Sequence, residues 1–555
     1  MMLRTRKVKH SYGFVFLVFV SFMGNKGVYM KVKKNNIAFT AIFMSSATLL
    51  AKFCGLLRDM ILASMYGTES AEAIAFSTAS RIPLLFFDIA LGTAVTSAFI
   101  PIFNEYLERK EEKMAMQFAN RFSNLIIFVT LIISVIGIVF SNQFIYIIAG
   151  DIPNNAFMLA SDLMKILFPT IIFTGLAFCF VGILQSYGEF NIPAIISLVS
   201  NGFLILYLLF VGNRLGVAGV AVAMLVAWGT QVIVQIPSLK RFKFRFSPSL
   251  RFNDDGIKKV AKLALPIIIS TWVQPINTMI NMRLSSGLNG GAAIPALDYA
   301  NKIYIILVGV FTFTITNIVF PRLSRAATSR NNEEYKATVR TSLGYVFFII
   351  APIMAGFLIL STPIIRLVYE RGNFDAASTS LTSTAFFFYS FGMLGYGVQE
   401  IMNKAFYSLQ DGKTPMRVAF LGIAVNISLS LLFVLGLNKG LGSLALAASI
   451  SANITGFVLL YKLSKTYNGL INKAFLKDIY KIILSVIIMS VAVIAVYGML
   501  KISLQNKFIL AFAPSAIGVL VYFACCIVFR VEELTYFIGV LKTRLLPKHK
   551  TKDRG

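Results

Sequence analysis

Histidine is nearly absent from this chain of 555 residues, and its two histidines, His10 and His549, lie close to the two ends. Cysteine is scarce as well, and all four cysteines fall within or at the edge of apolar runs: Cys54, Cys179, Cys525 and Cys526. These positions exclude histidine-based catalysis in the apolar part of the chain and favour packing cysteines over a disulfide or metal set. We therefore expect no metal site and no catalytic site.

Acidic residues are also few, with 24 Asp and Glu against 52 Lys and Arg, which gives a formal net charge of +28. In a soluble chain such an excess would suggest a nucleic-acid partner. Here 57% of the residues are hydrophobic and only 14% are charged. A chain of this composition favours basic loops on one side of a membrane, and we expect no nucleic-acid partner.

Apolar runs of 18 or more residues recur along the chain and predict an all-α integral membrane protein. The runs are continuous rather than alternating, which favours helices over a transmembrane barrel. About fourteen spans are expected, at residues 37–57, 75–101, 120–141, 158–186, 192–212, 216–237, 263–286, 297–320, 342–366, 379–407, 416–436, 441–461, 480–500 and 508–529.

The connections between these spans alternate in charge. The most basic one, SLKRFKFRFSPSLRFNDDGIKKVAK, lies between the sixth and seventh spans, whereas GTESAEA and SGLNGGAAIP carry no Lys or Arg. By the positive-inside rule both termini are cytoplasmic. Two cytoplasmic termini require an even number of spans, which agrees with fourteen.

The N-terminal segment contains FVFLVFVSFM at residues 14–23, which is too short to cross a bilayer. It is either an interfacial anchor or a segment preceding a true start at Met30. We expect five parts: a basic cytoplasmic extension (1–36), an N-lobe of helices 1–6 (37–240), a C-lobe of helices 7–12 (241–465), helices 13 and 14 (466–530), and a basic cytoplasmic tail (531–555).

The chain also repeats itself. SYGEFNIP at 186–193 matches SLQDGKTP at 408–415, ASRIPLL at 79–85 matches ANKIYII at 300–306, and two further pairs share the offset of 220–224 residues. This predicts two six-helix lobes in the same orientation, followed by two extra helices. Such parallel repeats are typical of secondary transporters, whose substrate site lies between the halves; a duplication without mechanistic use is the alternative.

Charged residues inside the predicted spans are costly in a bilayer and need a reason. Lys52 and Asp59 are seven residues apart on the first span with Arg58 beside them, and Arg81 and Asp88 are spaced likewise on the second. Lys302 occupies the position of the second repeat that matches Arg81. The three interpretations are Arg–Asp pairs that hold helices together, lysines that reach the membrane surface, and a binding site for an anionic head group. Four cations against two acids favour the third.

Several motifs resemble the lipid II flippases of the MurJ (MviN) family, which belongs to the multidrug, oligosaccharidyl-lipid and polysaccharide exporter superfamily. They are LLRD (56–59), GILQSYGEFNIP (182–193), ALDYANKIY (296–304), RLVYERGNFD (366–375) and AFYSLQDGKTP (405–415). The resemblance runs from about residue 37 to the C-terminus.

This resemblance implies a fourteen-helix flippase that moves undecaprenyl-diphosphate-linked peptidoglycan precursor, lipid II, to the outer leaflet by alternating access. It also implies that Lys52, Arg58, Arg81 and Lys302 bind the diphosphate, that Asp59 and Asp88 orient them or gate the cavity, and that the last two helices form a groove for the lipid tail. We expect no cofactor, coupling to the membrane potential or to a monovalent ion, surrounding membrane lipids as partners, and a monomer.

The chain also departs from the family pattern. Phe87 and Asp88 stand where relatives carry two arginines, Ile74 stands where an Asp is usual, and LGTA replaces an EGA signature. These departures keep two alternatives open: a flippase for another polyprenyl-linked saccharide, and a cation-coupled multidrug antiporter of the same superfamily.

Overall fold

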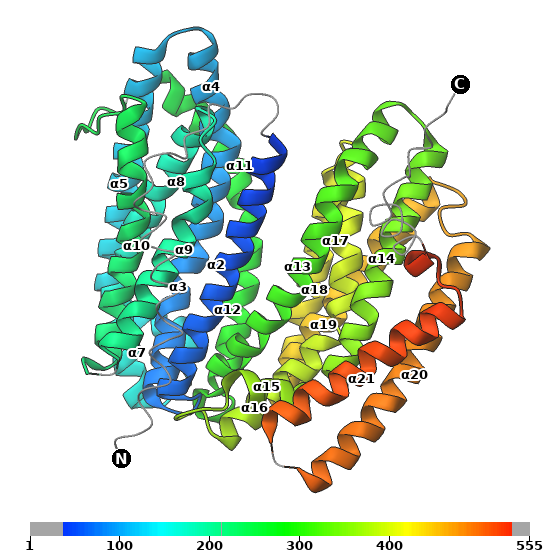
Figure 1. The fold of residues 1–555 in the computed structure, drawn as a ribbon. Helices are drawn as coiled ribbons and strands as arrows, with labels where there is room; N and C mark the ends of the chain where they lie inside the picture. Colours follow the sequence, from blue (N-terminus) through cyan, green and yellow to red (C-terminus); the bar gives the residue numbers. More distant parts are fainter. Residues whose placement is uncertain (1–36, 213, 253, 505, 536–555) are drawn as a thin grey trace, which may run out of the picture.

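The computed structural model describes residues 37–535 except 213, 253 and 505. The described residues form helices and no strand, which confirms the predicted all-α fold. Two bundles lie side by side, and a pair of long helices follows along the second bundle (Figure 1). The predicted extension at 1–36 and most of the tail at 531–555 lie outside the described residues.

The first part of the chain forms α2 (Ile37–Tyr66), α3 (Ala71–Ala94), η2 (Val95–Phe99), α4 (Ile100–Glu108), α5 (Glu112–Val139), α6 (Ser141–Ala149), α7 (Asn154–Leu167), α8 (Thr170–Ser186), α9 (Asn191–Phe210) and α10 (Gly216–Arg241). We call these helices the N-lobe.

After α11 (Asp255–Thr271), the second part forms α12 (Val273–Ser286), η3 (Asn289–Gly291), α13 (Ala293–Thr328), α14 (Asn332–Ile359), α15 (Ser361–Tyr369), α16 (Ala376–Ser390), α17 (Met393–Ser408), α18 (Lys413–Leu431), η4 (Leu432–Gly436) and α19 (Gly442–Thr466). We call α12–α19 the C-lobe. The final pair is α20 (Lys473–Ser503) and α21 (Lys507–Val528), which packs against α14 and α15.

Ten of the described helices are long and apolar enough to cross a membrane. Their outer faces are apolar where a bilayer would surround them: Val135 on α5, Val491 on α20 and Leu520 on α21 are each more than half exposed. The chain is therefore a multi-pass membrane protein, and the count of fourteen crossings stays a prediction.

The internal repeat is visible in the helix bounds. α9 starts at Asn191 and α18 at Lys413, and α3 starts at Ala71 and α13 at Ala293, so each pair keeps the offset found in the sequence. Even the interruptions recur: α7 gives way to α8 at residues 168–169, and α16 gives way to α17 at residues 391–392. The two lobes thus share one topology.

The predicted seventh span, 263–286, is not one straight helix. It is split at Trp272 into α11 and α12, and α11 begins earlier, at Asp255. Pro275 lies in the first turn of α12, where a missing backbone N–H costs little, so a new helix starts there more easily than the old one continues. The apolar run alone carries no sign of this break.

The linker between the lobes is fastened to the N-lobe. The Asn120 side chain donates to the carbonyl oxygen of Ser247 at 2.8 Å and accepts from the Ser247 N–H at 2.8 Å. Beyond the linker, Ile257 and Val260 of α11 are buried in one cluster with Phe118 of α5. α11 therefore packs on the N-lobe, although it follows the boundary predicted at residues 240–241.

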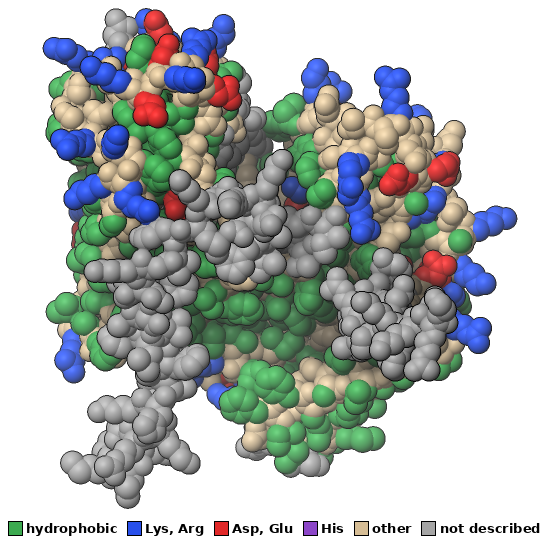
Figure 2. Space-filling model, turned by 45° about the horizontal axis from the view of Figure 1, so that its top comes forward, with side chains coloured by type: hydrophobic (Ala, Val, Ile, Leu, Met, Phe, Trp, Pro, Cys, Tyr) green, Lys and Arg blue, Asp and Glu red, His purple; other side chains and the backbone are tan. Residues whose placement is uncertain are grey.

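The two ends of the molecule differ. The connections at 109–111, 242–254, 329–331 and 467–472 lie at one end, which we call the basic end, and Lys and Arg gather around it (Figure 2). The connections at 67–70, 287–292 and 370–375 lie at the other, which we call the closed end. Viewed toward the basic end, the surface between the lobes is hollowed, with hydrophobic side chains on its floor (Figure 2).

The lobes meet at the closed end. The Asn373 N–H donates to the carbonyl oxygen of Ser64 at 2.8 Å, and the Asn373 side chain donates to that of Met65 at 2.6 Å. The Thr68 N–H donates to the Ser378 hydroxyl at 3.2 Å. The segment between α15 and α16 therefore closes on the C-terminal end of α2.

One helix start in this region gives a first prediction. The Asp375 carboxylate accepts from the Ser378 N–H at 2.9 Å and caps α16, and these hydrogen bonds lower the pKa of Asp375. Asp375→Ala should destabilise this turn by about 1 kcal/mol, whereas Asp375→Asn should keep most of the cap.

Because the pKa of Asp375 is lowered on folding, its contribution is present above the ordinary carboxyl pKa, near 4, and is lost as the pH falls below it. The difference in melting temperature between Asp375→Ala and the parent chain should therefore shrink in acid. An unchanged difference at low pH would contradict this account of the cap.

Candidate functional site

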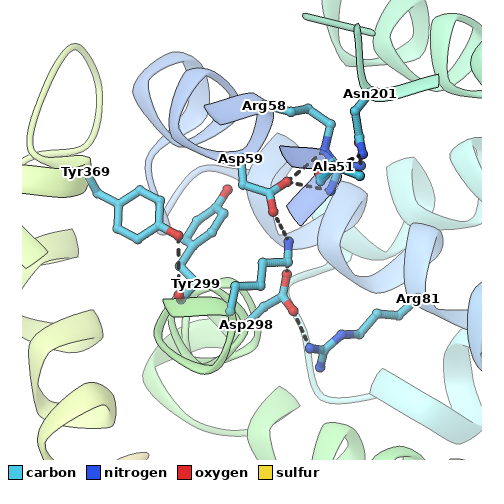
Figure 3. Close-up of polar contacts among 9 residues, drawn as sticks. Ala51, Arg58, Asp59, Arg81, Asn201, Asp298, Tyr299 and Tyr369 are labelled. Atoms are coloured by element: carbon cyan, nitrogen blue, oxygen red, sulfur yellow. Dashed lines mark hydrogen bonds and ion pairs between the residues drawn. The ribbon is translucent and has the colours of Figure 1, made fainter. Parts of the chain in front are cut away.

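Four of the predicted site residues come together where α2, α3 and α13 meet, near the closed end (Figure 3). Arg58 and Asp59 come from α2, Arg81 from α3 and Lys302 from α13, so both lobes contribute. Asp59 lies seven residues before the end of α2, which places it about 10 Å from that end at 1.5 Å per residue. The site therefore lies between the lobes, close to their contact at the closed end.

Asp59 is buried, with 4% of its surface exposed, and both carboxylate oxygens are paired. Its Oδ1 accepts from Nε and Nη2 of Arg58 at 2.9 and 2.8 Å, while its Oδ2 lies 2.9 Å from Nζ of Lys302. A buried carboxylate is tolerated in a membrane protein only with such partners. Asp59 therefore connects a cation of its own lobe with one of the other lobe.

Asp298 plays the corresponding part on α13. Its Oδ2 lies 2.7 Å from Nζ of Lys302, and its Oδ1 pairs with Nη2 of Arg81. Lys302 thus bridges two carboxylates. The result is a chain of ion pairs, Arg58–Asp59–Lys302–Asp298–Arg81, that crosses twice between the lobes; we call it the inter-lobe network.

Two neighbours position the network. The Asn201 side chain on α9 accepts from Nη1 of Arg58 at 2.9 Å and donates to the carbonyl oxygen of Ala51 at 3.4 Å, which holds the guanidinium group against α2 (Figure 3). On the other side, Nζ of Lys302 lies 5.7 Å from the ring centroid of Tyr299. An aromatic face beside an ammonium group adds a favourable electrostatic contact.

Tyr299 continues into the closed end. Its ring centroid lies 5.1 Å from that of Tyr369 and 6.1 Å from that of Phe374, and the Tyr369 hydroxyl donates to the Tyr299 carbonyl oxygen at 3.3 Å. Phe374 belongs to the segment that closes on α2 and is almost fully buried. Packed rings thus join the inter-lobe network to the closing segment.

Lys52 is not part of the network. Its Nζ lies 3.4 Å from where a methyl group on Gly309 of α13 would be, so it reaches toward the C-lobe about two turns above Asp59. No acidic partner lies within ion-pair distance of it among the described residues. Arg81 pairs with Asp298. The side chain of Asp88 lies outside the described residues, so the predicted pairing of Arg81 with Asp88 stays a prediction.

Sequence reasoning missed Asp298 and Asn201. Asp298 could have been found, because it precedes Lys302 by four residues in ALDYANKIY and so shares its helix face. Asn201 lies in an apolar run with no partner nearby in sequence, and only the packing of α9 on α2 brings it to Arg58. Ile74, which stands where the family pattern has an acid, is buried at the contact with η3.

The described residues of this region contain four cations and two acids. When the two described acids are paired, the described cations still leave positive charge over. Arg and Lys together can bind a phosphate-bearing group, Arg through its planar fork and Lys as a point charge.

A double substitution tests the inter-lobe pairing of Arg81 with Asp298. Asp298→Asn and Arg81→Gln should each lower the melting temperature of the purified protein, and the double variant should lose less than the two losses added together. For a pair in direct contact we expect a coupling of about 0.5–3 kcal/mol. Strictly additive losses would show that the two side chains do not support each other.

Comparison with known proteins gives concordant results. A family model described as "Lipid II flippase MurJ" matches residues 62–517. A "Probable lipid II flippase MurJ" of Buchnera aphidicola subsp. Schizaphis graminum is 28% identical over 462 residues, covering 82% of this chain and 88% of the relative. The "Lipid II flippase MurJ" of Burkholderia cenocepacia is 27% identical over 403 residues, covering 71% and 78%.

Solved structures agree. The "Lipid II flippase MurJ, inward closed conformation" superposes with a TM-score of 0.73 at 26% identity, covering 88% of this chain and 99% of that one. A multidrug resistance MATE family transporter of the MOP superfamily in an inward-facing conformation has a TM-score of 0.64 at 14% identity, covering 78% and 98%. The second likeness shows a shared fold alone.

Proposed function

This chain belongs to the lipid II flippase MurJ family, and from that premise we propose how its inter-lobe network serves transport. The chain is a lipid II flippase, which moves the lipid-linked peptidoglycan precursor across the membrane by alternating access. The resemblance in its motifs is thereby confirmed, and it favours this function over the saccharide flippase and the drug antiporter. The remaining proposals concern which residues carry the transport.

The bridge made by Lys302 carries the proposal. With Asp59 of the N-lobe on one side and Asp298 of the C-lobe on the other, its ammonium group joins the two lobes. A diphosphate entering from the hollow would compete with these carboxylates for Arg58, Arg81 and Lys302. Substrate binding would then exchange inter-lobe ion pairs for protein–substrate pairs, so that the lobes can move apart at the closed end.

Lys52 would meet the substrate first. It lies nearer the basic end than the network and has no acidic partner among the described residues. Because Lys52 is unpaired, it would attract the diphosphate toward the inter-lobe network. The diphosphate would then displace the carboxylates from the cations of the network. Asp59 and Asp298 would then serve as the gating acids.

The surroundings of this mechanism follow from charge. We place both termini and the basic end in the cytoplasm of a bacterial cell, because the basic connections lie at that end. An inside-negative potential favours the return of an empty, positively charged cavity, so coupling to the membrane potential or to a monovalent ion remains our proposal. We further propose a monomer with no cofactor and no enzymatic activity.

The test is rescue of a bacterial strain depleted of its lipid II flippase. The chain should restore growth, and the purified protein in vesicles should move lipid II faster than a polyprenyl-linked saccharide with a different head group. Failure to rescue, with resistance to a cationic dye, would favour the antiporter. Equal rates for the two lipids would favour the broader saccharide flippase.

A further inference from the structure

The C-lobe carries a pocket at the closed end, outside the inter-lobe network. It has a volume of about 540 Å³ and lies between α15, α16 and the segment that joins them. Its lining is partly polar and partly apolar, and its polar residues include Thr362, Arg366, Arg371 and Ser380. A pocket of this size and polarity can hold a small polar group.

Glu370 organises the pocket. Its Oε1 accepts from Nε of Arg366 at 2.7 Å, and its Oε2 accepts from the Thr379 hydroxyl at 3.1 Å. Its backbone carbonyl oxygen accepts from Nζ of Lys507, the first residue of α21, at 2.7 Å. One residue thus ties α15, α16 and α21 together and leaves no carboxylate oxygen free.

Arg366 has donors to spare. Its Nε is taken by Glu370, but neither Nη atom has a hydrogen-bond partner among the described residues. Arg371 is folded back on α15, where its Nη2 donates to the carbonyl oxygens of Leu367, at 3.0 Å, and Val368. The pocket therefore presents one arginine fork, held in place by its third nitrogen, in a lining that contains the cation of Arg371 and the acids Glu370 and Asp375.

The wall of the pocket is also the segment that closes the molecule. Within residues 370–375, Glu370 and Asp375 face the pocket, while Gly372 and Asn373 contact the end of α2. A ligand in the pocket would therefore contact the same segment, 370–375, that joins the two lobes.

The start of α21 lies beside the pocket wall, because Nζ of Lys507 donates to the Glu370 carbonyl oxygen. α21 starts at Lys507, and its neighbouring side chains Phe508 and Phe512 are 57% and 61% exposed, as expected for a face in contact with acyl chains. A head group carried by a lipid could reach the pocket while its tail stays in the bilayer.

We propose that this pocket binds the diphosphate group of a polyprenyl lipid at the closed end, on the side where the transported substrate is delivered. Arg366 donates both Nη atoms to the phosphate oxygens, and the hydroxyls of Thr362 and Ser380 are within its walls. A diphosphate in the pocket would pull on the segment at 370–375. Delivery of the head group would in this way be coupled to separation of that segment from the end of α2. The inference rests on the proposed function, which names the substrate.

The experiment places a reporter in the pocket. In a chain with its four cysteines replaced, exposed Ser380 is changed to Cys, and labelling by a membrane-impermeant maleimide is followed in nanodiscs of phosphatidylcholine. Undecaprenyl diphosphate in the bilayer should slow the labelling, and inorganic pyrophosphate is the second probe. Protection by both indicates that the diphosphate suffices, and protection by the lipid alone indicates that the tail contributes.

Arg366→Gln should weaken the protection about tenfold or more, as expected when charge-assisted hydrogen bonds are lost. Arg417→Gln, which changes an exposed arginine of α18, is the matched control and should retain protection. No protection by either probe, or equal protection in Arg366→Gln, would overturn the proposal.

The labelling assay measures binding in the pocket and does not measure transport. Lys302→Ala should therefore keep the protection even where it fails to rescue growth. Failure of the pocket and failure of the proposed function are in this way told apart.

Discussion

Lys302→Ala should abolish rescue of a flippase-depleted strain while the protein still accumulates in the membrane. The substitution removes the ammonium group that lies 2.9 Å from Asp59 and 2.7 Å from Asp298, and it leaves two acids facing each other across the lobes. Asp59 keeps Arg58 and Asp298 keeps Arg81, so each acid loses one of two cationic partners. Because the Lys302 side chain is 32% exposed, solvent screens part of the loss, and we expect a cost of about 2 kcal/mol. The substrate also loses one of its proposed cations.

Two controls separate charge from folding. Lys302→Arg keeps the positive charge and should retain part of the activity, although its fork cannot reproduce both contacts of the ammonium group. Lys465→Ala removes an exposed lysine in the last turn of α19 and should rescue as the parent chain does. Full rescue by Lys302→Ala would contradict a role for the inter-lobe network in transport.

Gly372→Ala should prevent the lobes from closing and should also abolish rescue. Gly372 has φ +58°, and a methyl group there would lie 2.2 Å from the carbonyl oxygen of Ser64. The backbone conformation alone costs an alanine about 1–2 kcal/mol, and the contact adds a clash with backbone that has no easy way to yield. The neighbouring hydrogen bond from Asn373 to Ser64 should break.

The matched control is Gly188→Ala, because Gly188 also has a positive φ, of +77°, but has nothing within 4 Å of an added methyl group. It reports backbone strain without the clash. Melting temperature and growth rescue should fall much further for Gly372→Ala than for Gly188→Ala. Equal effects would mean that the contact with Ser64 contributes nothing to closure.

Much of the architecture could be predicted from the sequence because it depends on local chemistry. Long apolar runs must be helices in a bilayer, and the offset between SYGEFNIP and SLQDGKTP is kept by the starts of α9 and α18. The split of the seventh span at Trp272 could not be predicted, because a continuous apolar run is compatible with one helix or with two.

The candidate site was predictable in part. Charges in apolar runs identified Arg58, Asp59, Arg81 and Lys302, and the structure brings these four together. The pairing between the lobes was not predictable, since Arg81 has an acid on its own helix at the spacing of two turns and yet pairs with Asp298 of the other lobe. Which side chain meets which is decided by the packing of α3 against α13, and the sequence of either helix contains no trace of it.

The fastening of the linker to α5 has a practical consequence for anyone who wishes to produce the halves as two polypeptides. A cut within residues 242–252 would leave α11 on the C-terminal fragment, away from the N-lobe helices on which it packs. Phe118 and its neighbours in the N-lobe would then be exposed. A cut in the turn at 287–292 would keep α11 with the helices that bury it, but would carry α12 away from α18. Neither division yields two fragments that each bury their own helices, because α11 packs on the N-lobe while α12 packs on α18 of the C-lobe.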